Sequence, residues 1–163
     1  MEQPDGNLFQ SQEGEPLFIA VPRHDPQMEA EANRARATLA MFIARFREGD
    51  TETTYSAKIR FSDPDHSKTV GEDRYLFLWV HVIEIEGESF SGMIFELPAS
   101  VQWLSKGQIV TFKTADVYDW MILQRGHLFG GYTLRVVREK IPESQRRNFD
   151  IYLGVSVYES LET

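Results

Sequence analysis

The sequence predicts an α+β fold: a mostly antiparallel sheet of five to six strands, with a long N-terminal helix and a short C-terminal helix. Two observations predict it. Residues 26–48 repeat apolar side chains at helical spacing, and several later runs have the composition and alternation of strands. A chain of 163 residues is the size of one domain. We place that domain at residues 25–163, after a mobile acidic leader at residues 1–24.

The first helix has clear start and stop signals. Asp25 is a good N-cap and Pro26 suits the first helical position. Gly49 is a plausible terminator. Between them, one apolar stripe recurs every three to four residues: Ala32, Ala35, Leu39, Phe42 and Phe46. The sequence therefore predicts one continuous helix over residues 26–48.

Strand patterns follow the helix. Residues 55–61 alternate apolar and polar side chains, which is typical of a half-buried strand. Residues 75–85 have apolar side chains at both odd and even positions, so both faces of this strand are expected to be covered. It is therefore expected in the centre of the sheet. Tight turns are expected at residues 86–88 and 124–127. Further strands are expected at residues 90–95, 109–112 and 120–123.

The remaining chain predicts a helix and a last strand. Gly130 and Gly131 precede a short helix whose apolar side is formed by Leu134, Val137 and Ile141. Residues 151–157 alternate apolar and polar side chains, so a final strand, at an edge of the sheet, is expected there.

The charge is acidic and unevenly distributed. Lys and Arg number 17 against 25 Asp and Glu, a net charge of −8. Residues 1–100 hold 18 acids and 9 bases, whereas residues 101–163 hold 7 acids and 8 bases. The basic residues concentrate near the C-terminus, at Arg135, Arg138, Lys140, Arg146 and Arg147. Glutamates interrupt this group, so we expect a solvated helix face and no nucleic-acid partner.

Composition excludes several classes of protein. The chain has no cysteine, which excludes a disulfide framework, a thiolate zinc site and a thiol nucleophile. No apolar run approaches the ~20 residues that span a membrane, and the first ten residues lack the features of a secretory signal. Asp63, Asp65 and His66 lack the spacing of a calcium loop and are interpreted as a charged hairpin loop. We expect a cytoplasmic protein without metal or cofactor.

An acidic row is the first candidate for function. Glu84, Glu86, Glu88 and Glu96 either form a solvated sheet face or display negative charge to a basic protein. Trp120 is a candidate aromatic anchor of that surface, with a place in the core as its alternative. His81 lies in the most apolar strand, and Glu84 and Glu86 have the opposite parity, so it is interpreted as a hydrogen-bonded core histidine.

A second candidate is a pocket near the later hairpin. The turn could bring Asp116, Asp119 and His127 together, and a carboxylate that orients a histidine supports a general base. Gly130 and Gly131 before a helix could form an anion cradle. In the structural alternative, Asp119 accepts hydrogen bonds from backbone N–H groups, and the glycines serve turn geometry.

Several short motifs together resemble a known family. The chain is similar to the YegJ-like bacterial family, a domain of unknown function (DUF2314), over about residues 26–138. The resemblance implies a compact α+β domain, and no activity or cofactor follows from it. The motifs that carry it are Asp25-Pro26 with ARATLAMFIARF, the YSAKIRF of residues 55–61, Leu78-Trp79-Val80, Phe90-Ser91-Gly92, the KGQIVTF of residues 106–112, Asp116, Asp119-Trp120-Met121, Gly126 and the GGYTLR of residues 130–135.

Three functions remain open from the sequence. The first is a non-catalytic binding protein, of an inhibitor or immunity type, that docks its acidic face on a basic bacterial partner such as a toxin. The second is an enzyme or small-molecule site built on Asp116, Asp119 and His127. The third is a scaffold or an oligomer in which the final strand pairs with a neighbour. The chain is expected to be a monomer or a weak homodimer.

Overall fold

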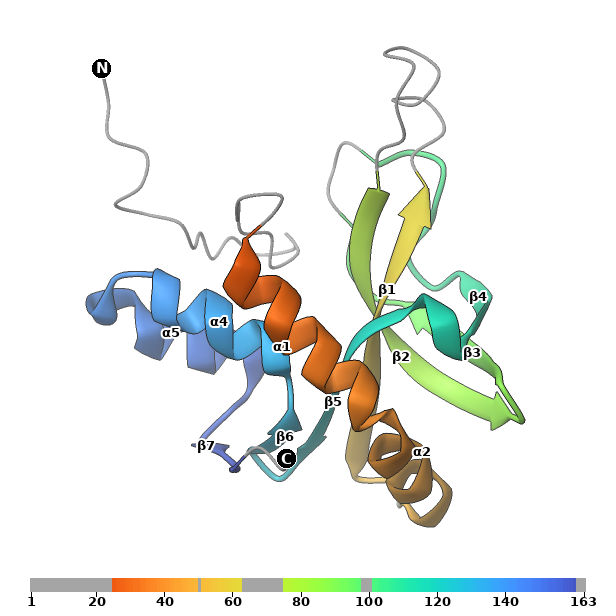
Figure 1. The fold of residues 1–163 in the computed structure, drawn as a ribbon, viewed down its shortest axis with the longest axis horizontal. Coiled ribbons are helices and arrows are strands. Elements are labelled where there is room, and N and C mark those ends of the chain that lie inside the picture. Colours follow the sequence, from red (N-terminus) through yellow and green to blue (C-terminus); the bar gives the residue numbers. More distant parts are fainter. Residues whose placement is uncertain (1–24, 50, 63–74, 98–100, 161–163) are drawn as a thin grey trace.

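A computed structural model describes residues 25–49, 51–62, 75–97 and 101–160. The predicted leader at residues 1–24 and the predicted charged loop at residues 63–66 lie outside these ranges. The described residues form one mixed sheet with four α-helices, which confirms the α+β class. Figure 1 shows α4 and α5 at the left, α1 across the middle, and β2, β3 and β4 at the right, with α2 below them.

The sheet has seven strands among the described residues, rather than five to six, in the order β4-β3-β2-β1-β5-β6-β7. All neighbours pair antiparallel except β6 and β7, which are parallel. The sheet is therefore mostly antiparallel, as predicted. Its strands are β1 (Thr53–Ser62), β2 (Tyr75–Glu86), β3 (Ser89–Ile94), β4 (Ile109–Lys113), β5 (Val117–Gln124), β6 (His127–Gly130) and β7 (Val157–Tyr158).

The predicted long helix is two helices, α1 (Pro26–Ala37) and α2 (Leu39–Glu48). The start at Asp25 is confirmed, because its carboxylate accepts from the N–H groups of Gln27 and Met28. The break falls at Thr38, whose hydroxyl donates to the carbonyl of Arg34. The indole N–H of Trp120 donates to the carbonyl of Ala35 over 3.0 Å. Both contacts occupy carbonyls of the last turn of α1, and this competition separates the two helices.

The C-terminal part holds two helices, α4 (Tyr132–Lys140) and α5 (Glu143–Leu153). The predicted strand at residues 151–157 is wrong over most of its length, because Ile151 and Leu153 belong to α5 and only Val157 enters β7. Phe149, Tyr152 and Leu153 pack into a cluster below α4, which is helical rather than strand spacing. Gly154, with φ of +81°, ends the helix.

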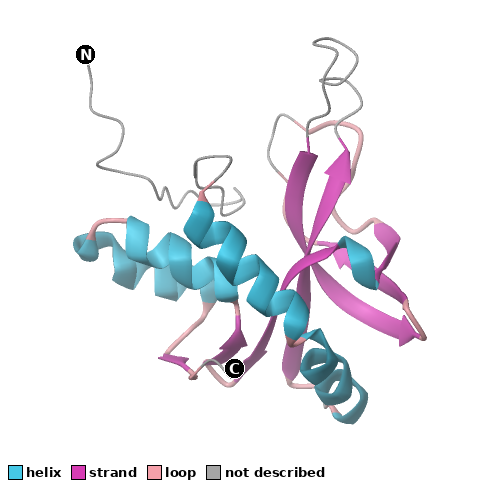
Figure 2. Ribbon diagram, in the orientation of Figure 1, coloured by secondary structure: helices cyan, strands magenta, loops and turns pink. Residues whose placement is uncertain are grey.

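Helices cover part of each face of the sheet. On the first face, α1 and α2 pack onto the main core around Phe42, Val80, Phe90 and Trp120. On the second face, the cluster of α4 and α5 packs against Trp79 of β2 and Met121 of β5. Figure 2 shows α4 and α5 on the side of the molecule opposite to β3 and β4. No described helix is long and apolar enough to cross a membrane.

A β-bulge in β2 changes which residues share the second face. Val82 pairs with Gly92 and Glu84 pairs with Ser91, so Ile83 is an extra residue in β2. The bulge reverses the alternation beyond it, and Glu84 therefore lies on the same face as His81. The parity argument from the sequence, which placed them on opposite faces, is wrong for this reason.

Candidate functional site

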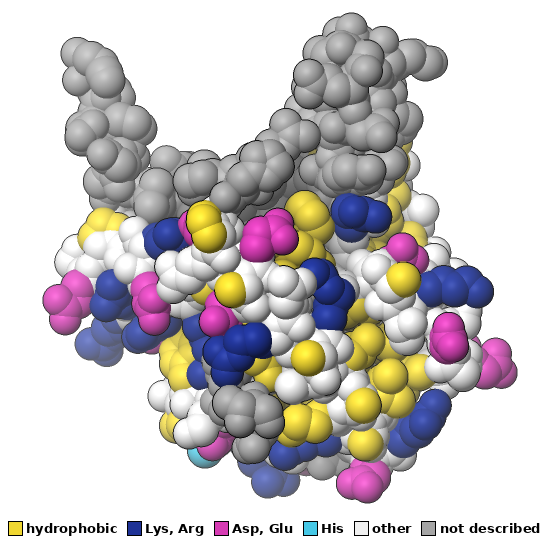
Figure 3. Space-filling model, in the orientation of Figure 1, with side chains coloured by type: hydrophobic (Ala, Val, Ile, Leu, Met, Phe, Trp, Pro, Cys, Tyr) yellow, Lys and Arg dark blue, Asp and Glu magenta, His cyan; other side chains and the backbone are white. Residues whose placement is uncertain are grey.

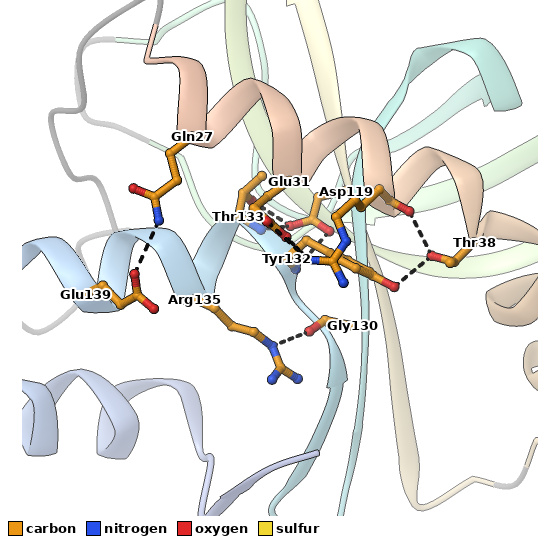
Figure 4. A network of polar contacts seen from close by, with 10 residues as sticks. Gln27, Glu31, Thr38, Asp119, Gly130, Tyr132, Thr133, Arg135 and Glu139 are labelled. Atoms are coloured by element: carbon orange, nitrogen blue, oxygen red, sulfur yellow. Dashed lines mark hydrogen bonds and ion pairs between the residues drawn. The ribbon is translucent and has the colours of Figure 1, made fainter. Parts of the chain in front are cut away.

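Asp119 of β5 caps helix α4 from the neighbouring strand. The first residue before α4 is Gly131, which has no side chain to cap the free N–H groups. The carboxylate of Asp119 accepts from the N–H groups of Tyr132 at 3.2 Å and Thr133 at 2.7 Å, and from the Thr133 hydroxyl. Figure 4 shows these three residues together at the start of α4. Asp119 is fully buried, and this confirms the structural alternative given for it above.

The buried carboxylate fills the proposed anion cradle. Burial raises the pKa of Asp119, and hydrogen bonds from Thr133 oppose that rise. Lys58 lies opposite Asp119 on β1, and its Nζ donates to the Thr133 hydroxyl over 3.4 Å. Burial lowers the pKa of Lys58, while the charge of Asp119 raises it. An external anion at this helix end would meet N–H groups that already have an acceptor.

The structure does not bring Asp116, Asp119 and His127 together. Asp116 accepts from the backbone N–H of Lys113 and closes a short 3-10 turn. His127 is exposed on β6, and its Nδ1 lies 2.5 Å from Glu159. Each of the three side chains therefore has its own separate partners. Gly130 and Gly131 do adjoin Asp119, because the Gly131 N–H donates to the carbonyl of Trp120.

Trp120 lies in the core and not on a binding surface. Only 2% of the residue is exposed. Its ring packs against Phe42 and Tyr132 with centroid distances of 5.6 and 5.9 Å. Its indole N–H also contacts Thr38. Trp120 therefore joins α1, α2 and α4 to the sheet, and a partner would not reach it on the folded surface.

The basic residues of α4 and α5 mostly face their own chain. Arg135 donates to the carbonyls of Gly130 and Leu128. Arg138 forms a bidentate pair with Asp150 at 2.8 and 2.9 Å. Two further cations are engaged in the same way: Lys140 with the Asp25 carboxylate, and Arg146 with the carbonyls of Arg138 and Glu139. These contacts hold α1, α4 and α5 together, which explains the local concentration of positive charge.

Three of the four predicted glutamates lie together. Glu84 and Glu86 are exposed on β2, and Glu88 is exposed in the turn that follows. Within the described residues none of them forms an ion pair. Glu96 lies apart, beyond β3, where its carboxylate accepts from the Tyr152 hydroxyl of α5. In Figure 3, acidic side chains protrude at the right-hand edge, where Figure 1 places the end of the sheet.

Beside these glutamates lies an apolar row that the sequence analysis missed. His81, Met93 and Ile109 are register partners across β2, β3 and β4. Ile109 is 54% exposed and Ile83 is 52% exposed. We call this surface the β2–β4 face, and its members are His81, Ile83, Glu84 and Glu86 of β2, Ser89, Ser91 and Met93 of β3, and Ile109, Thr111 and Lys113 of β4. Only the register of the strands reveals it, because its members are far apart in sequence.

His81 forms the border between this face and the covered part of the sheet. Its Nδ1 lies 3.2 Å from the hydroxyl of Ser56, which is fully buried. Its ring stacks on Phe95 with a centroid distance of 4.0 Å and an angle of 11°. Burial lowers the pKa of His81 below its ordinary value of 6.5. The interpretation of His81 as a hydrogen-bonded histidine is confirmed, although it is only half-buried.

Because the pKa of His81 is lowered, the free energy of unfolding should fall as the pH falls. In the window between the folded pKa and 6.5, the unfolded chain binds more protons at His81 than the folded chain. Stability from this group is therefore complete above pH ~6.5 and is lost as the pH falls through the folded pKa. We therefore expect the free energy of unfolding of the wild type to fall on acidification relative to that of His81→Phe, which lacks the titrating group. Urea titrations of both proteins from about pH 7.5 to about pH 5 measure it; parallel pH profiles would contradict it.

One small hollow lies on the other side of the sheet. It has a volume of about 110 Å³ and lies between α2, β6 and the C-terminal segment, with Arg45, Phe129, Tyr132 and Glu159 among its lining residues. Pockets for small molecules usually measure about 300 Å³ or more. Within the described residues no group of three His, Asp or Glu side chains is arranged to hold a metal ion.

Comparisons with known proteins give a family and one distant relative. The family model described as "Uncharacterized protein conserved in bacteria (DUF2314)" matches residues 25–157. A Neisseria meningitidis serogroup B protein named "Putative ankyrin repeat protein" is 26% identical over 87 residues. That match covers 52% of this chain and 34% of the relative, so the chain spans about a third of the relative's length. No solved structure matches the chain.

Proposed function

The chain belongs to the bacterial family DUF2314, and from the surface displayed by its matched region we propose that it is a non-catalytic protein-binding domain. Its partner is a basic bacterial protein, and its action is that of an inhibitor or immunity protein. The observation that carries the proposal is the group Glu84, Glu86 and Glu88, which is exposed and has no ion pair within the described residues. We call this group the acidic hairpin.

The acidic hairpin is suited to electrostatic recognition. Unpaired carboxylates of one sign attract a basic surface over several ångströms and speed association, and they repel acidic proteins. The net charge of −8 adds to that attraction. By contrast, four of the five cations of α4 and α5 (Arg135, Arg138, Lys140 and Arg146) donate to acceptors of the chain itself, whereas Arg147 is exposed. The displayed charge is therefore negative in the region that we propose for binding.

The Neisseria relative agrees with a role in recognition. Its printed name describes ankyrin repeats, and stacked repeats of that kind form extended binding surfaces. It shares only a third of its length with this chain, so the similar segment adjoins other sequence in that protein. A binding domain joined to further binding elements fits the proposal.

Removing the charge of the acidic hairpin tests the proposal. A partner is captured from a lysate of the source bacterium with the full chain, identified, purified and measured by surface plasmon resonance. We expect the triple variant Glu84→Gln, Glu86→Gln, Glu88→Gln to lower the association rate constant about tenfold at low salt. We also expect the wild-type rate constant to fall as salt rises, because ions screen the attraction.

A matched variant changes the same charge elsewhere. Glu29, Glu48 and Glu143 are exposed, and within the described residues they too lack ion pairs. Their replacement by Gln should lower the rate constant much less. The proposal fails if no basic protein is retained selectively by the wild type. It also fails if both triple variants slow association equally.

A further inference from the structure

We propose that the β2–β4 face is the docking site for an amphipathic basic helix of the partner. This inference rests on the proposed function and adds to it the residues that make contact and the form of the segment that they bind. The acidic hairpin alone would attract any basic surface. The apolar row beside it gives the site a defined orientation.

The sheet has an incomplete second layer. The cluster of α4 and α5 covers the second face at Trp79 and Met121. On the same face, beyond Tyr152 and its contact with Glu96, no described helix covers β3 or β4. An apolar row on a sheet, such as that of Met93 and Ile109, is stabilised by a further layer of helices or strands. A helix of the partner placed beside α5 would extend the layer that α4 and α5 begin.

The apolar row supplies the anchor points. His81, Met93 and Ile109 lie on one line across three neighbouring strands, and such strands are about 4.8 Å apart. Ile109 exposes 54% of its surface, and Met93 is half-buried. A few well-packed residues near the centre of an interface contribute most of its affinity. One or two apolar side chains of a helix would fit over this row.

Charge sets the direction of the docked helix. The carboxylates of Glu84 and Glu86 are on β2, whereas Lys113 is on β4, in register with Ser89. The face is therefore negative along β2 and positive at the end of β4. The cations of the partner helix would lie over β2, away from Lys113.

The spacing of the two regions matches a helix. Along β3, Met93 is four positions from Ser89, which pairs with Glu86. Four residues of a strand span about 13 Å. Two turns of a helix span about 11 Å, and a lysine side chain extends further. An apolar residue and a lysine two turns apart would therefore reach the apolar row and Glu86 at once.

A designed peptide tests the site on the full chain. The probe is a synthetic amphipathic helix with leucines in one turn and lysines two turns along, and a scrambled peptide of the same composition is its control. Amide chemical shifts of the labelled protein are expected to change around Ser91, Met93 and Thr111. Met93→Thr and Ile109→Thr should each raise the dissociation constant about tenfold. Thr keeps the strand preference, so both variants should fold.

One further variant is a control outside the site. Ile151 is 65% exposed on α5, and Ile151→Gln should leave the affinity unchanged. Lys113 belongs to the site, and Lys113→Gln should raise the affinity, because it removes a cation that repels the basic helix. Shift changes outside the β2–β4 face, equal binding of the scrambled peptide, or unchanged affinity in Met93→Thr and Ile109→Thr would overturn the inference. If the acidic-hairpin variant still slows the captured partner while these two variants have no effect, only the docking site fails. If none of the variants has an effect, the proposed function fails as well.

Discussion

Replacing Asp119 with alanine is expected to lower the free energy of unfolding by about 3–5 kcal/mol. The carboxylate is fully buried and accepts from the N–H groups of Trp120, Tyr132 and Thr133. Alanine leaves these donors without an acceptor and without water. It also removes the charge that partly compensates the buried amine of Lys58. Urea unfolding followed by Trp fluorescence measures the loss.

A second substitution separates the two causes. In the Asp119→Ala background, Lys58→Met removes the uncompensated amine and should restore part of the stability. Asp116→Ala is the matched control, since Asp116 accepts one backbone hydrogen bond near the surface. Its cost should be about 1 kcal/mol or less. A loss in Asp119→Ala no larger than in Asp116→Ala would show that Asp119 does not hold the start of α4.

The features that the sequence predicted well depend on neighbours in the chain. Asp25 and Pro26 start α1, as predicted, because a cap acts on the next three residues. The turn at residues 124–127 is confirmed, with positive φ at Arg125 and Gly126, as type I′ hairpin turns require at both central residues. The turn after Glu86 has positive φ at Gly87 for a similar reason. Such signals can be found without the rest of the fold.

The wrong predictions concern features that depend on contacts between residues far apart in the sequence. The break at Thr38 depends on the indole of Trp120, which is 82 residues away. The shared face of His81 and Glu84 depends on a bulge, and the bulge is set by pairing with β3. Ile151 and Leu153 fit a strand pattern as well as a helix, and packing under α4 decides for α5. The local sequence pattern carries no information about these contacts.

The candidate site likewise contains residues that the sequence reveals and residues that it does not. Acidic residues are visible in the sequence, and Glu84, Glu86 and Glu88 do lie together and exposed in the structure. The apolar row of Met93 and Ile109 is not visible, because its members come from different strands. For Asp119, the sequence offered both a catalytic and a structural role. The start of α4 at Gly131 distinguishes them, since a glycine cap leaves N–H groups for another acceptor.

Gly130→Ala is expected to be as damaging as the loss of Asp119, for a steric reason. Gly130 has φ of +75°, which costs an L-residue about 1–2 kcal/mol. A β-carbon there would lie 2.5 Å from Cζ3 and 2.6 Å from the carbonyl oxygen of Trp120. Since Trp120 is packed between α1, α2 and the sheet, it has no free space to move into. Strain and overpacking together should cost about 2–5 kcal/mol.

Gly107→Ala separates strain from overpacking. Gly107 has φ of +87°, and a β-carbon there would meet no atom within 4 Å. This variant should therefore show the backbone cost alone, about 1–2 kcal/mol. The difference between the two variants measures the close contact of Gly130 with Trp120. In Gly130→Ala the fluorescence of Trp120 should also change, and the amides of Tyr132 and Thr133 should exchange faster, because the cap is displaced with the strand. Equal losses in the two variants would mean that the start of α4 moves freely, and Gly130 would then matter only for its backbone angle.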